Sequence, residues 1–282
     1  MTYTKMLSSN NTHCCVKQYS QGGNKLNTLR ACNLTKKFEL SSKEQQKYKT
    51  KYKVAASDVS FEIHSGDVFG LIGANGAGKT TTMKMLATLI KPTSGNVFYN
   101  DKSIFDDPDN IRKEFAFLTS ELKLDARSTP SEMFDFFAKL YHLDKDFAAK
   151  RKEFLFKRFG IEEFENKKIE KLSQGMKQKI ALAISIIHDP SFIIFDEPTN
   201  GLDVIVAKDV RDFILSMRDE GKCIILSTHI FDLIEKTCNK VALMVDGKII
   251  KNDTIEHVMN GKSLEDAFYD IYTEQLAREK DI

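Results

Sequence analysis

The sequence Gly73-Ala-Asn-Gly-Ala-Gly-Lys-Thr80 constrains this chain more than any other stretch. It follows the pattern G-x-x-x-x-G-K-T, in which backbone N–H groups of a glycine-rich loop point at phosphate oxygens. The run 67–72 before it reads as a short buried strand, and residues 81–90 after it carry apolar side chains at helical spacing. A strand, a glycine loop and a helix in direct succession predict a phosphate-binding loop in an α/β fold.

Several residues of this loop have predicted roles toward a nucleotide. The glycines allow the backbone to curl, and the N-terminus of the following helix adds partial positive charge at the same place. Lys79 would reach the β- and γ-phosphates, and the Thr80 hydroxyl would ligate Mg²⁺. The alternative is a glycine-rich turn that binds nothing. The residues expected to contact the nucleotide are Gly73, Asn75, Gly76, Ala77, Gly78, Lys79, Thr80 and Thr81.

Two adjacent carboxylates, Asp196 and Glu197, follow the apolar run 192–195. That run reads as a buried strand, and Pro198 prevents it from continuing. In an open α/β sheet, ligands bind beyond the carboxyl ends of the strands. Successive strand residues point to opposite sides, so the two carboxylates need not share a role. We expect Asp196 to hold Mg²⁺ through water and Glu197 to polarise the attacking water; a solvated strand end is the alternative.

Two further positions fit the same chemistry less specifically. Ser173 precedes a long predicted helix, whose N-terminus would be an anion site; the alternative is that Ser173 only caps the helix. His229 follows a predicted strand that ends at Thr228, and from there it could approach a γ-phosphate. A single histidine after a strand is also often just an exposed residue.

Taken together, the motifs GANGAGKT, LSQGM, IIFDEP, NGLD and STH occur in an order that resembles the ATP-binding subunit of ABC transporters. The similarity covers about residues 30–275. The residues of the motifs look most like those of ATPase subunits that serve separate export-type permeases. The resemblance implies the ABC ATPase fold: a P-loop α/β core with a mainly parallel sheet, an antiparallel β-subdomain and a helical subdomain. It also implies ATP and Mg²⁺ as ligands.

The resemblance assigns a role to further residues. Phe38 matches the aromatic residue that stacks on adenine, and Asp203 matches the loop that couples the two ATP sites. Ser173 and Gly175 match the signature that closes on the γ-phosphate of the opposite subunit. Such a signature implies a head-to-tail dimer, expected to be a homodimer, in which each chain holds half of each site.

In the same way, Asp196 matches the metal-organising acid, Glu197 the general base and His229 the switch histidine. One departure concerns the glutamine that usually follows the second core strand, because Ser120 or Glu121 stands there instead. The contact that this loop makes with metal and water therefore stays open.

A second departure is the lysine-rich segment 41–53, which lengthens the path from Phe38 to the next strand. We expect a solvated hairpin or loop here, with contact to acidic lipid headgroups or to an acidic partner surface as the sharper alternative. Because of this insertion, Tyr48 or Tyr52 could supply the adenine platform in place of Phe38.

The rest of the chain sets the expected domain organisation. Residues 1–28 lack acidic side chains and are expected to be a disordered extension, with a transit peptide as the weaker alternative. Residues 29–282 form the ATPase domain, beginning with an edge strand at 29–38. Within it, the segment 121–175 is expected to be a helical subdomain, and Thr129 to Glu132 form a capping box at the start of one of its helices.

Composition narrows the function further. The net charge of +2 gives no argument for nucleic acid, and the five cysteines show no metal-binding or disulfide spacing. No stretch approaches the roughly 20 apolar residues that span a bilayer. These features predict a cytoplasmic chain, and the resemblance implies a subunit that is peripheral on the cell membrane and paired with an integral membrane permease. The alternatives are a soluble ABC-type ATPase that acts on ribosomes or DNA and a module that senses ATP without hydrolysing it.

Overall fold

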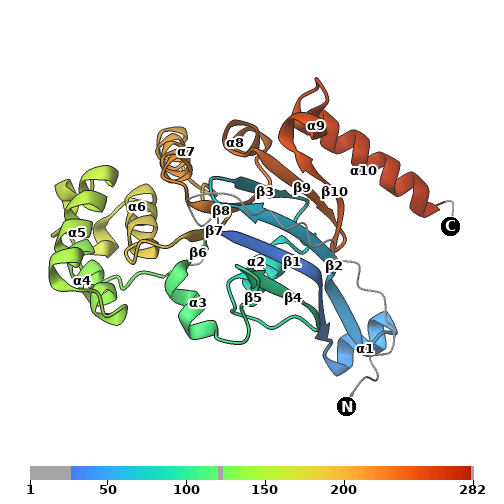
Figure 1. The fold of residues 1–282 in the computed structure, drawn as a ribbon, viewed down its shortest axis with the longest axis horizontal. Coiled ribbons are helices and arrows are strands. Elements are labelled where there is room, and N and C mark those ends of the chain that lie inside the picture. Colours follow the sequence, from blue (N-terminus) through green and yellow to red (C-terminus); the bar gives the residue numbers. More distant parts are fainter. Residues whose placement is uncertain (1–26, 120–122, 281–282) are drawn as a thin grey trace, which may run out of the picture.

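A large, mainly parallel sheet forms the centre of the molecule (Figure 1). This computed structural model describes residues 27–119 and 123–280. The sheet has the strand order β10-β9-β3-β8-β7-β6, and every neighbouring pair except β9–β10 is parallel. Its strands are β3 (Val68–Ile72), β6 (Phe115–Thr119), β7 (Phe192–Asp196), β8 (Cys223–Thr228), β9 (Lys240–Val245) and β10 (Lys248–Thr254). The predicted α/β core is confirmed.

A second, antiparallel sheet has the order β2-β1-β4-β5 and confirms the predicted β-subdomain. Its strands are β1 (Thr28–Glu39), β2 (Tyr52–His64), β4 (Ser94–Tyr99) and β5 (Lys102–Ser103). The prediction of β1 as an edge strand is wrong, because β1 lies between β2 and β4 and pairs with both. Its second partner, β4, follows β2 and β3 in the chain, so the residues of β1 alone do not reveal this pairing.

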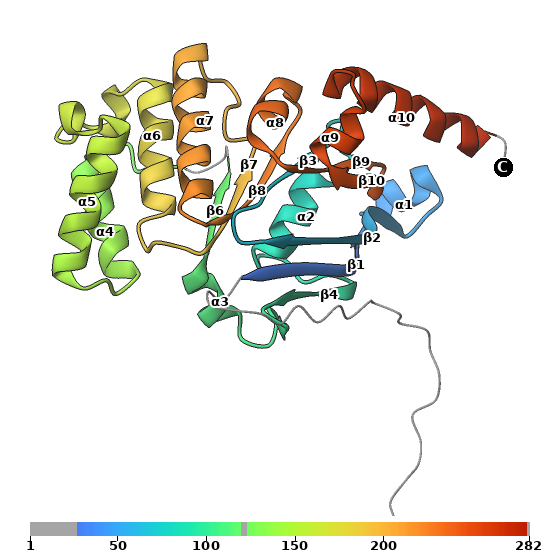
Figure 2. The same ribbon diagram turned by 45° about the horizontal axis from the view of Figure 1, so that its top comes forward.

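Helices cover both faces of the large sheet. Figure 2 shows α2 (Lys79–Leu86) between the two sheets, whereas α6, α7 and α8 lie against the opposite face. Alternate residues of β3 serve the two cores: Val68 and Ile72 pack with α6, α7 and α8, while Phe69 and Leu71 pack with α2 and the smaller sheet. The α-helices that follow α2 are α3 (Pro108–Glu114), α4 (Pro130–Leu140), α5 (Lys145–Phe159), α6 (Gln174–Ser185), α7 (Val204–Asp219), α8 (Phe231–Thr237), α9 (Ile255–Met259) and α10 (Leu264–Lys280).

The lysine-rich segment 41–53 differs from the prediction of a hairpin or loop. It contains the helix α1 (Ser42–Tyr48), and its last residues already belong to β2. Ser41 and Glu44 form a reciprocal capping box at the start of α1. No residue of α1 is buried, so local capping rather than packing defines this helix.

The helices α4 and α5 lie at the end of the molecule away from the smaller sheet (Figure 1). Thr129 and Glu132 form the predicted capping box, and Pro130 is the first residue of α4. Residues 1–26 of the predicted extension, and Ser120 and Glu121, lie outside the described residues, whereas Thr28 already belongs to β1. No helix within the described ranges is both long and apolar enough to cross a bilayer.

Candidate nucleotide-binding site

The loop at residues 73–78 connects β3 to α2 and is packed closely from two sides. A Cβ on Gly73 would lie 2.3 Å from the carbonyl oxygen of Met244, and one on Gly78 would lie 2.2 Å from that of Ala55. Gly78 also has φ +104°, a conformation that other residues rarely adopt. Glycine is therefore required at both positions, and the loop is held against β9 and β2.

Lys79, the first residue of α2, extends into the space enclosed by this loop. Its side chain is buried, and its Nζ donates to the carbonyl oxygens of Gly73 at 2.7 Å and Ala74 at 3.3 Å. Burial lowers the pKa of Lys79, and the nearby charges of Glu197 and Asp196 act in the opposite direction. A phosphate entering the loop would compete with the two carbonyl groups for this ammonium group and would relieve the cost of its burial.

Asp196 and Glu197 lie at the carboxyl end of β7, as predicted. Asp196 is buried, and its carboxylate accepts a hydrogen bond from the Ser227 hydroxyl of β8. Glu197 has a left-handed backbone conformation, with φ +54°, and its N–H donates to the Ser227 carbonyl oxygen at 2.9 Å. This turn of the backbone sends the two adjacent carboxylates in different directions.

The Glu197 carboxylate connects the phosphate loop to the end of β8. Its Oε1 lies 4.0 Å from Lys79 Nζ, while its Oε2 accepts from the Thr228 hydroxyl at 3.3 Å and lies 3.0 Å from His229 Nδ1. The carboxylate is largely buried, whereas half of the His229 side chain is exposed. A carboxylate held in this way can orient a water molecule and accept its proton.

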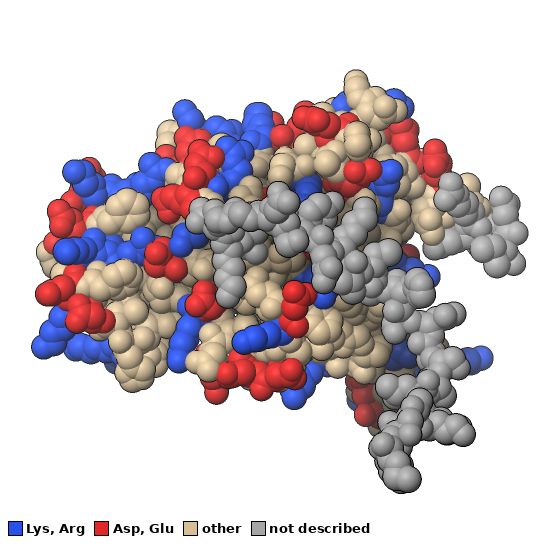
Figure 3. Space-filling model, viewed as in Figure 1, with Lys and Arg blue, Asp and Glu red and all other residues tan. Residues whose placement is uncertain are grey.

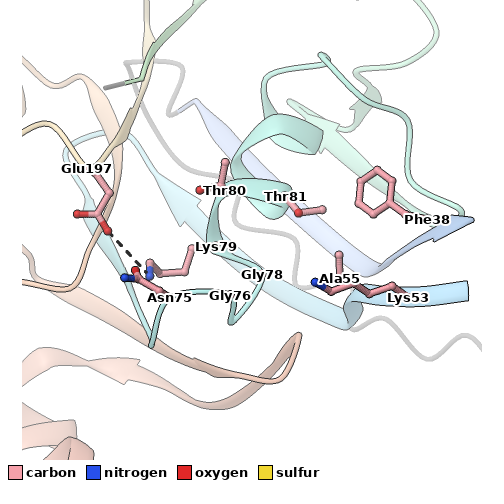
Figure 4. Close-up of a pocket in the computed structure, with 10 residues that line it drawn as sticks. All are labelled: Phe38, Lys53, Ala55, Asn75, Gly76, Gly78, Lys79, Thr80, Thr81 and Glu197. Carbon is pink, nitrogen blue, oxygen red and sulfur yellow. Dashed lines mark ion pairs between the residues drawn. The ribbon is translucent and has the colours of Figure 1, made fainter. Parts of the chain in front are cut away.

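Lys79, Glu197 and part of the glycine loop line one cavity of about 310 Å³, within the usual size range of ligand sites, whereas Asp196 and His229 are not among its lining residues. Figure 4 shows Phe38 at one end of the cavity, Glu197 at the other and the glycine loop between them. The lining residues are Phe38, Lys53, Ala55, Asn75, Gly76, Gly78, Lys79, Thr80, Thr81 and Glu197.

The residues that line the cavity distinguish among the three aromatic residues considered as the adenine platform. Phe38 lines the cavity, whereas Tyr48 and Tyr52 do not. Lys53 and Ala55 were missed, because the sequence analysis placed Lys53 in a loop. The register of β2 against β1, which sets Lys53 opposite Phe38, places this lysine at the cavity.

The structure does not bring Ser173, Gly175 or Asp203 to this cavity. Ser173 caps α6, with its hydroxyl accepting from Met176 N–H at 3.2 Å. A Cβ on Gly175 would lie 2.8 Å from a methyl group of Val206 in α7, so glycine allows α6 and α7 to approach closely here. Asp203 caps α7 by accepting from the N–H groups of the next turn. These three residues line a different part of the surface.

Oxygen donors for a divalent cation lie at the phosphate-loop end of the site. Thr80 supplies a hydroxyl that lines the cavity, and Asp196 supplies a buried carboxylate. Within the described ranges, no group of three or more His, Cys, Asp or Glu side chains could hold a metal ion. This donor set fits Mg²⁺, which is usually bound through one or two carboxylates together with substrate phosphates and water. The fold and the site thus define a nucleotide-binding protein of the P-loop class.

Comparison with known proteins identifies the family. The family model described as "ABC transporter" matches residues 56–200. The "ABC transporter ATP-binding protein NatA" of Bacillus subtilis (strain 168) is 35% identical over 83% of this chain and 96% of its own length. The solved "Structure of ATP binding subunit of ABC transporter" has a TM-score of 0.76 and 26% identity over 86% of this chain and 99% of its own.

A further solved structure, titled "Dimeric structure of a post-hydrolysis state of the ATP-binding cassette MJ0796 bound to ADP and Pi", shares the fold. Its TM-score is 0.70 at 22% identity, over 80% of this chain and 98% of its own. The chain belongs to the ABC transporter family, as an ATP-binding subunit with ATPase activity.

Proposed function

We propose that this subunit powers transport, of the export type, through a separate integral membrane permease, by ATP-driven closure of a head-to-tail dimer. The observation that carries the proposal is that the residues expected at one ATP site lie in two separate places on a single chain. The phosphate loop and Glu197 line one cavity and His229 contacts Glu197, whereas Ser173 and Gly175 lie elsewhere on the surface. A second copy, related by a twofold axis, would bring its own Ser173 and Gly175 to the cavity and create two equivalent sites.

The shape of the cavity supports one orientation of ATP. Phe38 offers an aromatic face for adenine at one end, and the loop N–H groups and Lys79 receive the phosphates. The γ-phosphate then lies toward Glu197. Glu197 accepts a proton from the attacking water, while Lys79 stabilises the charge that develops on the γ-phosphate oxygens.

Thr80 and Asp196 are the residues that would hold Mg²⁺. When bound, the ion would neutralise negative charge on the phosphates. Ser227 fixes the Asp196 carboxylate, which keeps one of its oxygens oriented before any ligand arrives. His229 holds Glu197 from the exposed side and can pass the state of the γ-phosphate to the surface of the chain.

Apolar side chains next to Asp203 support the dimer. Val204 and Ile205 are 86% and 76% exposed, although both are large and apolar. They begin α7, whose Val206 packs against Gly175 of the signature segment. A second copy that reaches the cavity with Ser173 would also cover these side chains, which explains their exposure in a single chain.

We assign the subunit to the cytoplasmic face of the cell membrane, as one ATPase domain over 29–282 with a helical subdomain near 121–175. The alternative of an ABC-type ATPase that acts on ribosomes or DNA is less consistent with a chain that has one phosphate loop and a net charge of only +2. The residues of the signature and phosphate-loop motifs favour export over import.

Fractionation of cells that express the tagged chain tests this function. After solubilisation of the membranes in mild detergent, we expect the chain to purify with an integral membrane protein at fixed stoichiometry. Reconstitution with that protein should raise ATP hydrolysis, and a Lys79→Ala chain should assemble equally but stay inactive. A chain that remains in the cytosol, or that sediments with ribosomes, would contradict the transporter assignment.

A further inference from the structure

Lys53 occupies a position in the cavity that the functional motifs do not explain. In the pairing of β1 with β2, Lys53 lies directly opposite Phe38. Lys53 and Ala55 both line the cavity, whereas Tyr52 and Val54 do not. The strand therefore directs this lysine toward the same space as Phe38.

The charge of Lys53 has no close partner among the residues that the structure describes. Two nearby lysines, in contrast, do have partners. Lys36 Nζ donates to the Lys91 carbonyl oxygen at 2.7 Å, and Lys51 forms an ion pair with Glu39 at 3.4 Å. Lys53 acts at longer range on Glu44, a carboxylate that Ser41 already holds in the capping box. An exposed ammonium group at the wall of a cavity is thus left available for a ligand.

The position of Lys53 along the cavity defines what such a ligand must offer. Figure 4 shows Lys53 between Phe38 and the phosphate loop, with its nitrogen on the side of Gly78. A nucleotide with adenine at Phe38 and its γ-phosphate at Glu197 places the ribose and the α-phosphate in this interval. Of these, only the α-phosphate carries the negative charge that binds an ammonium group well.

The contacts of Lys79, the other lysine of the cavity, also support a role for Lys53 at the α-phosphate. Lys79 lies at the far end of the loop, where it contacts the carbonyl groups of Gly73 and Ala74 and approaches Glu197. It serves the terminal phosphates. The cavity lining contains Lys53, Lys79 and Glu197 as its charged side chains, so Lys53 is its second cation.

We propose that Lys53, contributed by the lysine-rich segment 41–53, is an additional nucleotide-binding residue that contacts the α-phosphate. The proposal rests on the orientation of ATP given above. It gives the insertion a function in the ATP site: the segment changes the connection between β1 and β2 and places a cation opposite the adenine platform.

Binding measurements with Lys53→Met test the proposal. We expect the Kd of ATP and that of ADP to rise by the same factor, roughly threefold to tenfold, as for the loss of one partly exposed charged contact. The affinity for adenosine, measured by competition with ATP, should not change, and Lys53→Arg should retain most of the affinity for ATP. Lys47→Met is the matched control, since Lys47 is an exposed lysine of α1 outside the cavity lining, and it should bind like the wild type.

Each other outcome overturns the proposal. Equal losses for Lys53→Met and Lys47→Met would show a general effect of the basic surface. A loss confined to ATP would place Lys53 at the γ-phosphate, and weaker competition by adenosine would place it at the ribose or base. Unchanged affinity would remove it from the site. Failure of the wild type to bind ATP would instead contradict the proposed function, and thermal unfolding without nucleotide checks that the variants fold.

Discussion

His229 Nδ1 and Glu197 Oε2 lie 3.0 Å apart, at the ends of two neighbouring parallel strands. Parallel pairing of β7 with β8 places Asp196 beside Ser227, so the residues that follow each strand emerge at the same edge of the sheet. The other oxygen of Glu197 faces Lys79 at 4.0 Å. The carboxylate is thus oriented between the phosphate loop and the histidine within a single chain.

Replacement of Glu197 by glutamine should separate ATP binding from hydrolysis. Glutamine keeps the size and hydrogen-bonding capacity of the side chain but cannot accept a proton from water. We expect ATP binding to be retained and turnover to fall by about 10²-fold or more. Hydrolysis rates measured at saturating ATP check this. Glu163→Gln is the control, since Glu163 is exposed and does not line the cavity. Near-normal turnover would remove Glu197 from the role of general base.

Loss of the aromatic ring at Phe38 should weaken ATP binding more than loss of either tyrosine. Stacking on a base contributes about 1–3 kcal/mol, so Phe38→Ala should raise the Kd roughly tenfold. Tyr48→Ala and Tyr52→Ala should have little effect, because neither side chain lines the cavity. Calorimetric titration of the three variants gives the ranking, and the reverse order would mean that the adenine platform lies elsewhere.

An acidic side chain at position 205 should block dimer closure without disturbing the fold. Ile205 is 76% exposed in the first turn of α7, where an added aspartate favours the helix. In the dimer the same charge would be buried against a second copy. We expect Ile205→Asp to retain ATP binding but to weaken ATP-dependent dimerisation by roughly tenfold or more. Light scattering with ATP measures this. Glu220→Lys, at the other end of α7, is the control, and unaltered dimerisation of Ile205→Asp would place the interface elsewhere.

Asp67 anchors the start of the strand that leads into the phosphate loop. Its carboxylate accepts from Lys240 Nζ at 2.7 Å, Asn239 Nδ2 at 2.8 Å and His64 N–H at 2.9 Å. Burial raises the pKa of Asp67, but these hydrogen bonds outweigh it and hold the pKa below the ordinary value of 3.8. Because the folded state has the lower pKa, the stabilisation is present above that ordinary value and is lost as the pH falls through the folded pKa.

Asp67→Asn should therefore lower stability at neutral pH and weaken its dependence on acid. We expect the free energy of unfolding at pH 7 to fall by about 1.5–3 kcal/mol, the usual contribution of hydrogen bonds to a charged group. At an acidic pH below the folded pKa of Asp67, the variant and the wild type should converge. Urea denaturation at both pH values measures this. Asp101→Asn, at an exposed ion pair with Arg30, should change little. A constant difference across the pH range would contradict the electrostatic explanation.

Local signals in the sequence predicted most of the site. The spacing of glycines from Gly73 to Gly78 specifies the loop, because close approach of Met244 and Ala55 leaves no room for a side chain. Apolar runs that end in Asp196 or Thr228 predicted the strand ends, since buried parallel strands are continuously apolar. These features depend on residues close together in the chain.

Features that depend on how strands pair were missed. Lys53 lines the cavity because β2 pairs with β1 in one particular register, which neither segment specifies alone. For the same reason β1 was wrongly predicted to be an edge strand, since its pairing with β4 could not be foreseen. The helix α1 is different, because its capping signal at Ser41 and Glu44 was present in the sequence and was overlooked.

We propose that each ATP site contains residues of two chains, and mixing two inactive variants tests this most directly. Lys79→Ala removes the phosphate-loop lysine, and Ser173→Arg blocks the signature, so neither homodimer should hydrolyse ATP. A mixed dimer contains one intact site, with the phosphate loop from the Ser173→Arg chain and the signature from the Lys79→Ala chain. We predict that an equimolar mixture recovers up to roughly a quarter of wild-type turnover, because about half of the dimers are mixed and each has one of two sites. Turnover no higher than that of the separate variants would contradict a site shared between two chains.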